Sequence, residues 1–577
     1  MSSLSHQSCD PGRLGAEQAA PGGAGEPRPL PDVSRRALML GGIGAAGATL
    51  AGCGAAASEQ EPPVRIKAAD TTLFQPNFNP YSGQALQGAS GLIYEPMQVI
   101  TAMDVENPEQ WLASAFTWNE DGTVLTATLR EDVRWTDGEV FDAEDVVFTF
   151  LMMRDFPAAN TAALPLLDAV AVDEFTVEIS FESTTFAQEP TIGELPIVPE
   201  HVFSAFEDPS AEQVEDPVGT GPYALERFSD QLYTFVRNDE HWMAEEFAPR
   251  TLAWPSYTSQ TMATAMQAGD IDWAGDFIAN IDQIFVQHDP EHRGHWYPGN
   301  GIFNLTFNLE KELWQDLELR RGISLAIDRQ ELSDIAMLGY VDVPHPTALP
   351  RPTFEEFISE DLRDQEFVFD PDEAERVLDA AGYARGADGV RVAPDGTPLS
   401  FALQIPSDYN DWVIATQVLD EQLRRVGIQF TPRGVSFESW TESRDMGTFD
   451  VTLSIVAAGL GPWFMYRSML SSEHAPEDDG RVFANFQRWY DEETDELLSA
   501  FAETEEETER ARAIDGLQRI VVDELPAVPI ITAPNWFNYN TEVWTGFPSE
   551  ENPYALGSPV NAADRMIILR RLSRTDG

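Results

Sequence analysis

Segments typical of strands alternate with segments of helical period from Val64 onward. Residues 123–129 and 175–181 alternate apolar and polar side chains with period two, which is typical of half-buried strands. Between them, Asp142 precedes an apolar helical face, as a capping residue does where a helix begins. Further helices are predicted over 370–381, 411–425 and 505–524. The alternation predicts a mixed α/β fold.

The charge of the chain excludes two classes of partner. Its 577 residues include 97 Asp plus Glu and 36 Lys plus Arg, a formal net charge of −61. Binding to nucleic acid or to an anionic membrane surface needs clustered cations, and lysine occurs only at positions 67 and 311. With 43% hydrophobic residues the chain can still bury a large core, and its length allows about three or four domains.

Such acidity is tolerable where salt screens it. At about 1 M salt the Debye length is about 3 Å, so the carboxylates repel one another only at short range. We interpret the composition as an adaptation to a high-salt medium, of the kind found in haloarchaeal proteins. The alternative is an acidic protein without that adaptation.

The first 63 residues read as an export signal followed by a tether. Arg35 and Arg36 precede an apolar run rich in small residues, which resembles a twin-arginine signal. The run is shorter than the roughly 20 residues that span a bilayer. Residues 50–53, Leu-Ala-Gly-Cys, have the form of a lipobox, so we predict cleavage after residue 52 and a lipid on Cys53. Residues 53–63 would then form a flexible tether.

Two further patterns argue against ion sites. The cysteines are Cys9 and Cys53, so the chain after residue 52 has neither a disulfide nor a thiolate metal site. The acidic runs 355–375 and 491–509 lack the Asp-x-Asp-x-Asp-Gly order of a calcium loop. We interpret them as solvated helix faces.

Several short motifs occur in a fixed order along the chain. The most specific block comprises residues 133–138, Val-Arg-Trp-Thr-Asp-Gly, and 142–148. Other motifs lie at 94–97, 111–113, 121–123, 129–130, 219–223, 237–242, 319–329, 423–428 and 526–530. Together they resemble the family 5 extracellular solute-binding proteins, the peptide, nickel and opine class that serves ABC importers. The resemblance covers about residues 64–570.

This resemblance implies a fold and a function. The fold is a two-lobed α/β structure like the type II periplasmic binding proteins, with an extra domain inserted in the first lobe and a ligand cleft between the lobes. The implied parts are lobe one over 64–98, 218–307 and 526–577, the extra domain over 99–217, and lobe two over 308–525, with hinges near 304–308 and 526–534. The expected protein is a monomeric, non-enzymatic receptor without cofactor, anchored outside the membrane through Cys53, whose partners are an ABC permease, its ATPase subunits and a solute.

Some motif residues are expected to be structural. Gly219, Gly221 and Pro222 predict a turn with unusual backbone angles before a strand that begins at Tyr223. Trp135 stands before a turn, where its ring can close the core beneath the loop.

The ligand site departs from the pattern of the peptide-binding members. Those proteins place a Trp, an Arg and a strand ending in Trp-x-x-Asp around the ligand, and the Asp pairs with the amino terminus of the peptide. Trp440 and Arg444 match the first two, but residues 457–459, Ala-Ala-Gly, lack the Trp and the Asp. A buried ammonium without a carboxylate costs several kcal/mol, so another acid must replace it.

We expect Asp408 or Asp411 to be that acid. Aromatic side chains could also line a groove for sugar rings or apolar groups, although each of them could instead belong to the core. The aromatic candidates are Tyr81, Tyr409, Trp412, Trp440, Trp463, Tyr466 and Trp536.

Three other functions stay open. An oligosaccharide receptor of the same family would explain the missing acid. A metal or metallophore receptor is suggested by His288, His292 and His295, although Pro290 and Gly294 break the helix that would align them. A hydrolase is disfavoured because residues 322–326 break the Gly-x-Ser-x-Gly pattern and no His-Glu-x-x-His occurs. The solute itself and the permease are not defined by the sequence.

Overall fold

The computed structural model describes residues 61–67, 73–407, 409–475 and 480–575. The predicted signal peptide, Cys53, all but the last residues of the tether, and Asp408 lie outside the described residues. The chain from Gln60 onward is a single compact unit.

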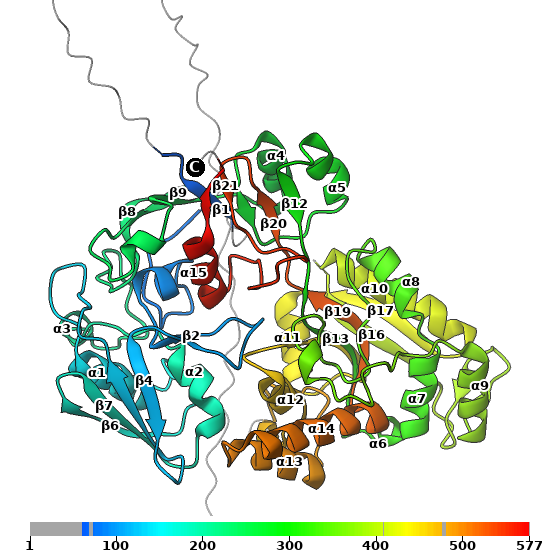
Figure 1. Cartoon of the computed structure of the whole chain (residues 1–577). Helices are drawn as coiled ribbons and strands as arrows, with labels where there is room; N and C mark the ends of the chain where they lie inside the picture. The colour runs from blue at the N-terminus through cyan, green and yellow to red at the C-terminus, as the bar shows by residue number, and fades with distance from the viewer. Residues whose placement is uncertain (1–60, 68–72, 408, 476–479, 576–577) are drawn as a thin grey trace, which may run out of the picture. The chain divides into compact units, whose positions relative to one another are not determined.

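A seven-stranded sheet collects strands from three distant stretches of the chain (Figure 1). Its order is β12-β20-β11-β1-β10-β9-β8, and β1 pairs in parallel with both β10 and β11. The strands are β1 (Val64–Lys67), β8 (Tyr223–Ser229), β9 (Leu232–Arg237), β10 (Thr251–Pro255), β11 (Trp273–Ala274), β12 (Arg293–His295) and β20 (Asn538–Asn540). The nearby helices are α4 (Ser259–Ala268), α5 (Ile281–Ile284) and α15 (Ala562–Arg571). The sheet thus unites the three segments expected in lobe one.

A second, antiparallel sheet lies within residues 99–217, where the extra domain is predicted. Its order is β4-β5-β7-β6, with β4 (Ala113–Trp118), β5 (Val124–Leu129), β6 (Leu166–Asp173) and β7 (Thr176–Phe181). Helices α1 (Ala143–Asp155), α2 (Glu189–Gly193) and α3 (Glu200–Phe203) accompany it. Asp142 and Asp145 form a capping box at the start of α1, and buried Trp135 donates to Asp145 Oδ2 at 2.9 Å. The two predicted strands, the helix start and the buried position of Trp135 are confirmed.

A third sheet has the order β17-β16-β18-β13-β19. Its strands are β13 (Gly299–Phe307), β16 (Ser400–Pro406), β17 (Gln429–Val435), β18 (Val451–Ala457) and β19 (Val528–Pro534). Strand β16 is parallel to β17 and β18, whereas β13 is antiparallel to both of its neighbours. One apolar cluster joins the sheet to α7 (Leu317–Leu325), α8 (Arg329–Ala336), α9 (Pro371–Ala380) and α10 (Asn410–Arg425); another joins it to α12 (Pro462–Leu470), α13 (Glu492–Ala502) and α14 (Glu507–Glu524).

The remaining elements are short. Two are the helices α6 (Glu312–Gln315) and α11 (Phe437–Asp445). Three strand pairs are β2 (Gln98–Val99) with β3 (Glu109–Gln110), β14 (Ala384–Arg385) with β15 (Arg391–Val392), and β21 (Trp544–Thr545) with β22 (Ser573–Arg574). The short π- and 3-10-helical segments are η1 (Ala89–Ile93), η2 (Phe186–Gln188), η3 (Ala244–Glu246), η4 (Val286–His288), η5 (Glu355–Phe357) and η6 (Ser472–His474).

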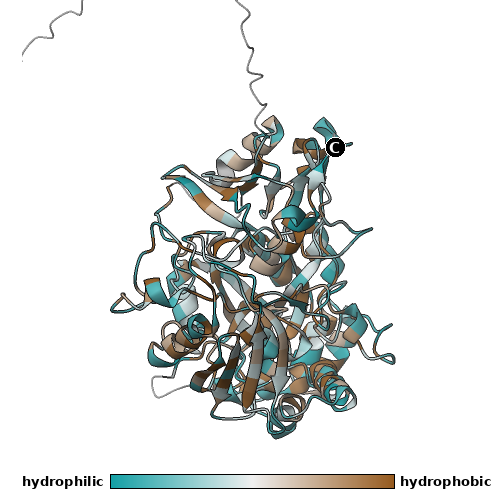
Figure 2. Ribbon diagram, turned by 60° about the vertical axis from the view of Figure 1, so that its left-hand side comes forward, coloured by the Kyte–Doolittle hydropathy of each residue, from teal (hydrophilic) through white to brown (hydrophobic). Residues whose placement is uncertain are grey.

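Amphipathic patterning accounts for the long helices. The helices predicted over 370–381, 411–425 and 505–524 appear as α9, α10 and α14, each with a buried apolar face. Figure 2 shows both hydrophobic and hydrophilic residues along the helices, as expected for helices packed on one side. No helix among the described residues is long and apolar enough to span a bilayer.

Strand pairing bears on the hinges, whose positions stay a prediction. We placed them near 304–308 and 526–534, but β13 and β19 are paired strands inside the five-stranded sheet. The chain instead passes between the seven-stranded and five-stranded sheets at 296–298, after β12, and at 535–537, before β20. The division into lobes stays a prediction.

The turn before β8 is corrected. The strand begins at Tyr223 as predicted, but neither Gly219 nor Gly221 has a positive φ. Both glycines are needed for close approach: a Cβ on Gly219 would lie 2.0 Å from the carbonyl oxygen of Ile93, and one on Gly221 would lie 2.1 Å from that of Leu92. Glycine is required at these two positions because the backbone of residues 92–93 lies where a side chain would be.

Candidate functional site

The ends of five strands define one edge of the third sheet, which we call the carboxyl edge. The parallel strands β16, β17 and β18 all end there, β13 begins there, and β19 ends there, with Gly299 opposite Pro534 and Gly301 opposite Ala457. In sheets with parallel strands, ligands bind outside the carboxyl ends. The predicted residues Tyr409, Asp411 and Trp536 follow these strand ends directly.

Two exposed rings stand on this edge and two buried tryptophans support them. Tyr409 is 40% and Phe437 is 48% exposed, and their ring centroids are 6.0 Å apart. Trp412 and Trp440 are 3% and 4% exposed, and each packs against one of the exposed rings. The indole of Trp440 also donates to Thr452 Oγ1 at 3.0 Å.

Both rings are enclosed in the core and support the exposed rings, and the expected contact of Trp412 and Trp440 with ligand stays a prediction. Phe437 is a candidate that the sequence interpretation missed. Its signal was its place as the first residue of α11, two residues after β17 ends at the same edge as Tyr409.

Asp411 lies partly buried in the first turn of α10. Burial raises the pKa of its carboxyl group, and the backbone N–H groups of the helix start partly offset this effect. Among the described residues no arginine, lysine or histidine forms an ion pair with it. Asp411 therefore remains able to receive a cationic group.

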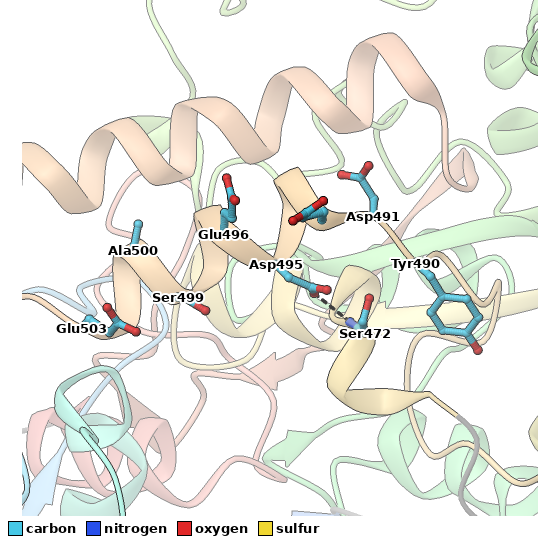
Figure 3. Close-up of a pocket in the computed structure, with 9 residues that line it drawn as sticks. Ser472, Tyr490, Asp491, Asp495, Glu496, Ser499, Ala500 and Glu503 are labelled. Carbon is cyan, nitrogen blue, oxygen red and sulfur yellow. Dashed lines mark hydrogen bonds between the residues drawn. The ribbon is translucent and has the colours of Figure 1, made fainter.

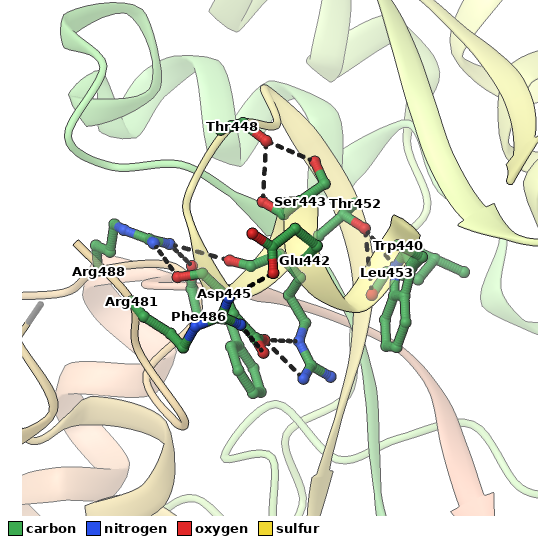
Figure 4. Close-up of polar contacts among 11 residues, drawn as sticks. Trp440, Glu442, Ser443, Asp445, Thr448, Thr452, Leu453, Arg481, Phe486 and Arg488 are labelled. Carbon is green, nitrogen blue, oxygen red and sulfur yellow. Dashed lines mark hydrogen bonds and ion pairs between the residues drawn. The ribbon is translucent and has the colours of Figure 1, made fainter. Parts of the chain in front are cut away.

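Arg444 is held in a structural network (Figure 4). Its guanidinium donates to Asp445 Oδ1 at 2.9 Å and lies over the rings of Trp440 and Phe486, 4.6 and 3.9 Å from their centroids. Asp445 also pairs with Arg481, and its backbone carbonyl accepts from buried Arg488 at 2.8 Å. These contacts fix α11 to residues 481–488, and the ligand role of Arg444 stays a prediction.

Tyr81 and Tyr466, two of the three predicted tyrosines, are core residues. Tyr81 donates its hydroxyl to the carbonyl of Pro196 at 2.8 Å, and Tyr466 donates to that of Thr347 at 2.8 Å. Both side chains are buried, and burial raises the pKa of each phenol. Each hydroxyl donates to a backbone carbonyl, and the expected contact of Tyr81 and Tyr466 with ligand stays a prediction.

Trp536 is half-buried and belongs to an aromatic cluster at the crossing between the sheets. Its ring lies 4.7 Å from that of Phe277 and 4.7 Å from that of Tyr297. Tyr297 in turn borders a cavity of about 920 Å³, which Tyr340 and Arg329 also line. Trp536 thus lies between the carboxyl edge and this cavity.

Trp463 is brought to a second cavity, of about 630 Å³, which we call the Trp463 cavity. Its indole donates to the carbonyl of Leu498 at 3.0 Å and its ring stacks on Phe501. The cavity is lined by the β2–β3 connection, η2, α2, η5, the loop after β18, and helices α12, α13 and α14. Its apolar wall comprises Ile100, Phe186, Trp463, Phe464, Phe501 and Ile514.

The other predicted clusters do not assemble sites. Gln267 contacts His288, Asp289 contacts His292, and Asp282 contacts His295. In the parts of the chain that the structure describes, no group of three His, Cys, Asp or Glu side chains could hold a metal ion. The acidic run from 491 onward forms the hollow of Figure 3, where the carboxylates of α13 lie along a largely exposed helix face.

Comparison with known proteins agrees with this architecture. Residues 107–476 match the bacterial extracellular solute-binding proteins, family 5. Protein XP55 of Streptomyces lividans is 28% identical over 75% of this chain and 77% of its own length. The nickel-binding periplasmic protein of Escherichia coli (strain K12) is 26% identical over 81% of this chain and 87% of its own length.

Solved structures share the fold. The periplasmic oligopeptide-binding protein of Thermotoga maritima superposes with a TM-score of 0.80 at 24% identity, over 90% of this chain and 100% of that chain. The same protein with bound mannohexaose gives a TM-score of 0.74 over the same shares of both chains. At this identity the likeness shows the two-lobed fold alone. The family match spans most of the chain, so the protein belongs to the family 5 extracellular solute-binding proteins.

Proposed function

We propose that this protein is the receptor of an ABC importer, which captures a peptide or a peptide-sized solute between its two lobes and delivers it to the permease and its ATPase subunits. The observation that carries the proposal is the pair of exposed rings, Tyr409 and Phe437, fixed by buried tryptophans at the carboxyl edge. Rigid aromatic surface of this kind binds solutes at low entropic cost. A monomer is sufficient, because family members enclose the ligand within one chain.

The predicted export signal implies that the protein is held outside the membrane by a lipid anchor. Cleavage after residue 52 would leave Cys53 carrying the lipid, and residues 53–63 would connect the anchor to the folded unit. A receptor held at the membrane keeps a high local concentration near its permease. Replacing Cys53 by serine should release the protein into the medium without changing solute affinity, and membrane fractionation checks this.

The ligand class has two further candidates within the same family. An oligosaccharide fits the exposed rings and the missing Trp-x-x-Asp pattern, and the T. maritima relative was solved with mannohexaose. A nickel complex is suggested by the nickel-binding relative of E. coli. The described histidines do not favour nickel, because each contacts a different side chain.

A binding screen tests the proposal. The purified chain is heated with pools of short peptides, with oligosaccharides and with Ni²⁺, in high salt, and then titrated calorimetrically with any stabilising ligand. A ligand at 100 times its Kd raises the free energy of unfolding by about 2.7 kcal/mol. Phe437→Ala should weaken binding at least tenfold, whereas Phe483→Ala, another exposed phenylalanine, serves as the control. Absence of binding to every pool would contradict the proposal.

A further inference from the structure

The Trp463 cavity contains two opposite charges that do not pair with each other. Glu189 begins α2 and Arg510 lies in the first turns of α14, and both line the cavity. Both feel the charge of Glu505, which also lines the cavity, and then the charge of each other, yet neither forms an ion pair in the described part of the chain. The surrounding wall is apolar and aromatic, so neither charge has full access to water.

Glu189 is held in place from one side. Its Oε2 accepts a hydrogen bond of 2.6 Å from the indole of Trp118, and the amide of Gln98 also faces the carboxylate. Burial raises the pKa of the Glu189 carboxyl group. The hydrogen bonds from Trp118 and Gln98 lower this pKa and offset part of the effect of burial. The contacts orient the group and leave it without a cation of its own.

Arg510 is fixed in a similar way. Its Nε donates to the carbonyl of Thr504 at 2.8 Å, and its guanidinium lies 4.9 Å from the ring centroid of Phe501. Burial lowers the pKa of the guanidinium. Its two terminal nitrogens have no hydrogen-bond acceptor among the described residues, so a fork of donors is available for a planar anion.

Carboxylates also surround the mouth of the cavity. Glu106, Glu356 and Glu507 are exposed and line it, and burial together with the charges of the other two raises the pKa of Glu106. Like charges so close together create a local negative potential. Such a potential attracts the cationic end of an approaching solute.

We propose that the Trp463 cavity binds the charged ends of a zwitterionic ligand, with an ammonium group at Glu189, a carboxylate at Arg510, and apolar side chains against Trp463 and Phe501. This rests on the receptor function proposed above and names its substrate class: a short peptide or amino acid with free termini. Glu189 then replaces the carboxylate that residues 457–459 lack.

The energetics favour this ligand over a neutral sugar. An uncharged oligosaccharide would enclose Glu189 and Arg510 and offer neither an ionic partner in direct contact, and a desolvated charge without such a partner is costly. A zwitterion supplies one partner for each. Burial in the apolar cavity then strengthens both contacts, because screening by water is reduced.

The experiment combines two variants with modified ligands. A free peptide from the screen, its N-acetylated form and its C-amidated form are titrated calorimetrically into the full chain, Glu189→Gln and Arg510→Gln. Glutamine at 189 still accepts the hydrogen bond from Trp118. We expect Glu189→Gln to lower the affinity for the free peptide at least tenfold and to leave the affinity for the N-acetylated form unchanged. We expect Arg510→Gln to lower the affinity for the free peptide at least tenfold and to leave the affinity for the C-amidated form unchanged.

Two exposed residues provide matched controls. Arg512→Gln lies on the same helix, and Glu182→Gln lies in the same inserted segment; neither residue lines the cavity, so both should bind as the unmodified chain does. If the unmodified chain binds the peptide and the two cavity variants bind it equally well, the zwitterion site is overturned while the receptor function stands. If the chain binds oligosaccharides but no peptide, the zwitterion site also fails. Absence of all binding overturns both proposals.

Discussion

At the scale of single residues, exposure separates side chains that the sequence presents as equivalent. Trp412 and Trp440 form a buried layer beneath Tyr409 and Phe437 at the carboxyl edge. Trp412 also packs edge-on against Phe303 of β13, at 5.5 Å between centroids. Large aromatic side chains in such positions stabilise the fold, whereas their exposed neighbours are free to touch a solute.

Paired substitutions distinguish these roles. Trp440→Ala should cost about 3–5 kcal/mol in the free energy of unfolding, because it empties a packed site and removes the hydrogen bond to Thr452. Phe437→Ala should cost under about 1 kcal/mol, because its ring is half exposed, and should instead weaken ligand binding. Urea titration and calorimetry measure the two effects. Equal losses of stability would contradict the assignment.

A second residue-scale prediction concerns pH. Asp564 on α15 is fully buried, and burial raises the pKa of its carboxyl group to about 7. Hydrogen bonds from the Leu556 N–H and the Thr101 hydroxyl lower the pKa and offset part of this effect. Burial raises the pKa of Glu194 to about 8, and the charge of Asp564 adds to this effect. The native state therefore holds protons that the unfolded chain releases near pH 4, so these groups make stability fall as pH rises from about 4 to about 8.

Asp564→Asn should remove the Asp564 part of this dependence. Relative to the unmodified chain, the variant should gain on the order of 2–4 kcal/mol in the free energy of unfolding between pH 4 and pH 8. Urea titrations at both pH values measure the difference. Asp216→Asn, at an exposed position, should show no such gain. A gain of the same size in both variants, or in neither, would contradict a buried neutral Asp564.

At the scale of elements, local rules predicted individual segments, and pairing decided where they belong. Asp142 and Asp370 accept hydrogen bonds at the starts of α1 and α9, as their spacing indicates. Caps and periodicity depend on neighbours within one or two turns, so the sequence shows them directly. The membership of β13 and β19 in the five-stranded sheet depends on strands far away in the chain, so the sequence does not show it directly.

The turn before β8 gives the prediction at this scale. Gly219→Ala should destabilise the chain by about 1–3 kcal/mol or more, since the new methyl group meets the backbone carbonyl of Ile93 and one segment must move. Gly83→Ala meets nothing within 4 Å and has no positive φ, so it should stay within about 0.5 kcal/mol. Urea midpoints compare the variants. A tolerated Gly219→Ala would show that the close approach is not required.

At the scale of the whole molecule, the formal charge of −61 should make stability depend on salt. Between 0.1 and 1 M NaCl the Debye length falls from about 10 to about 3 Å, so most of the self-repulsion of the folded surface is screened in this range. We therefore expect the thermal midpoint to rise steeply up to about 1 M and slowly above it. A midpoint unchanged between 0.1 and 1 M would contradict adaptation to a high-salt medium.

The sequence by itself determined the features that depend on near neighbours or on sums: the α/β alternation, the helix caps, the net charge and the family motifs. The tertiary structure alone decided which aromatic rings are enclosed and that Glu189 and Arg510 line the same cavity. It alone also decided that Arg444 forms a hydrogen bond with Asp445. Burial and pairing depend on contacts between segments far apart in the chain. A residue type cannot report them, because a tryptophan in the core and one beside a ligand obey the same local rules.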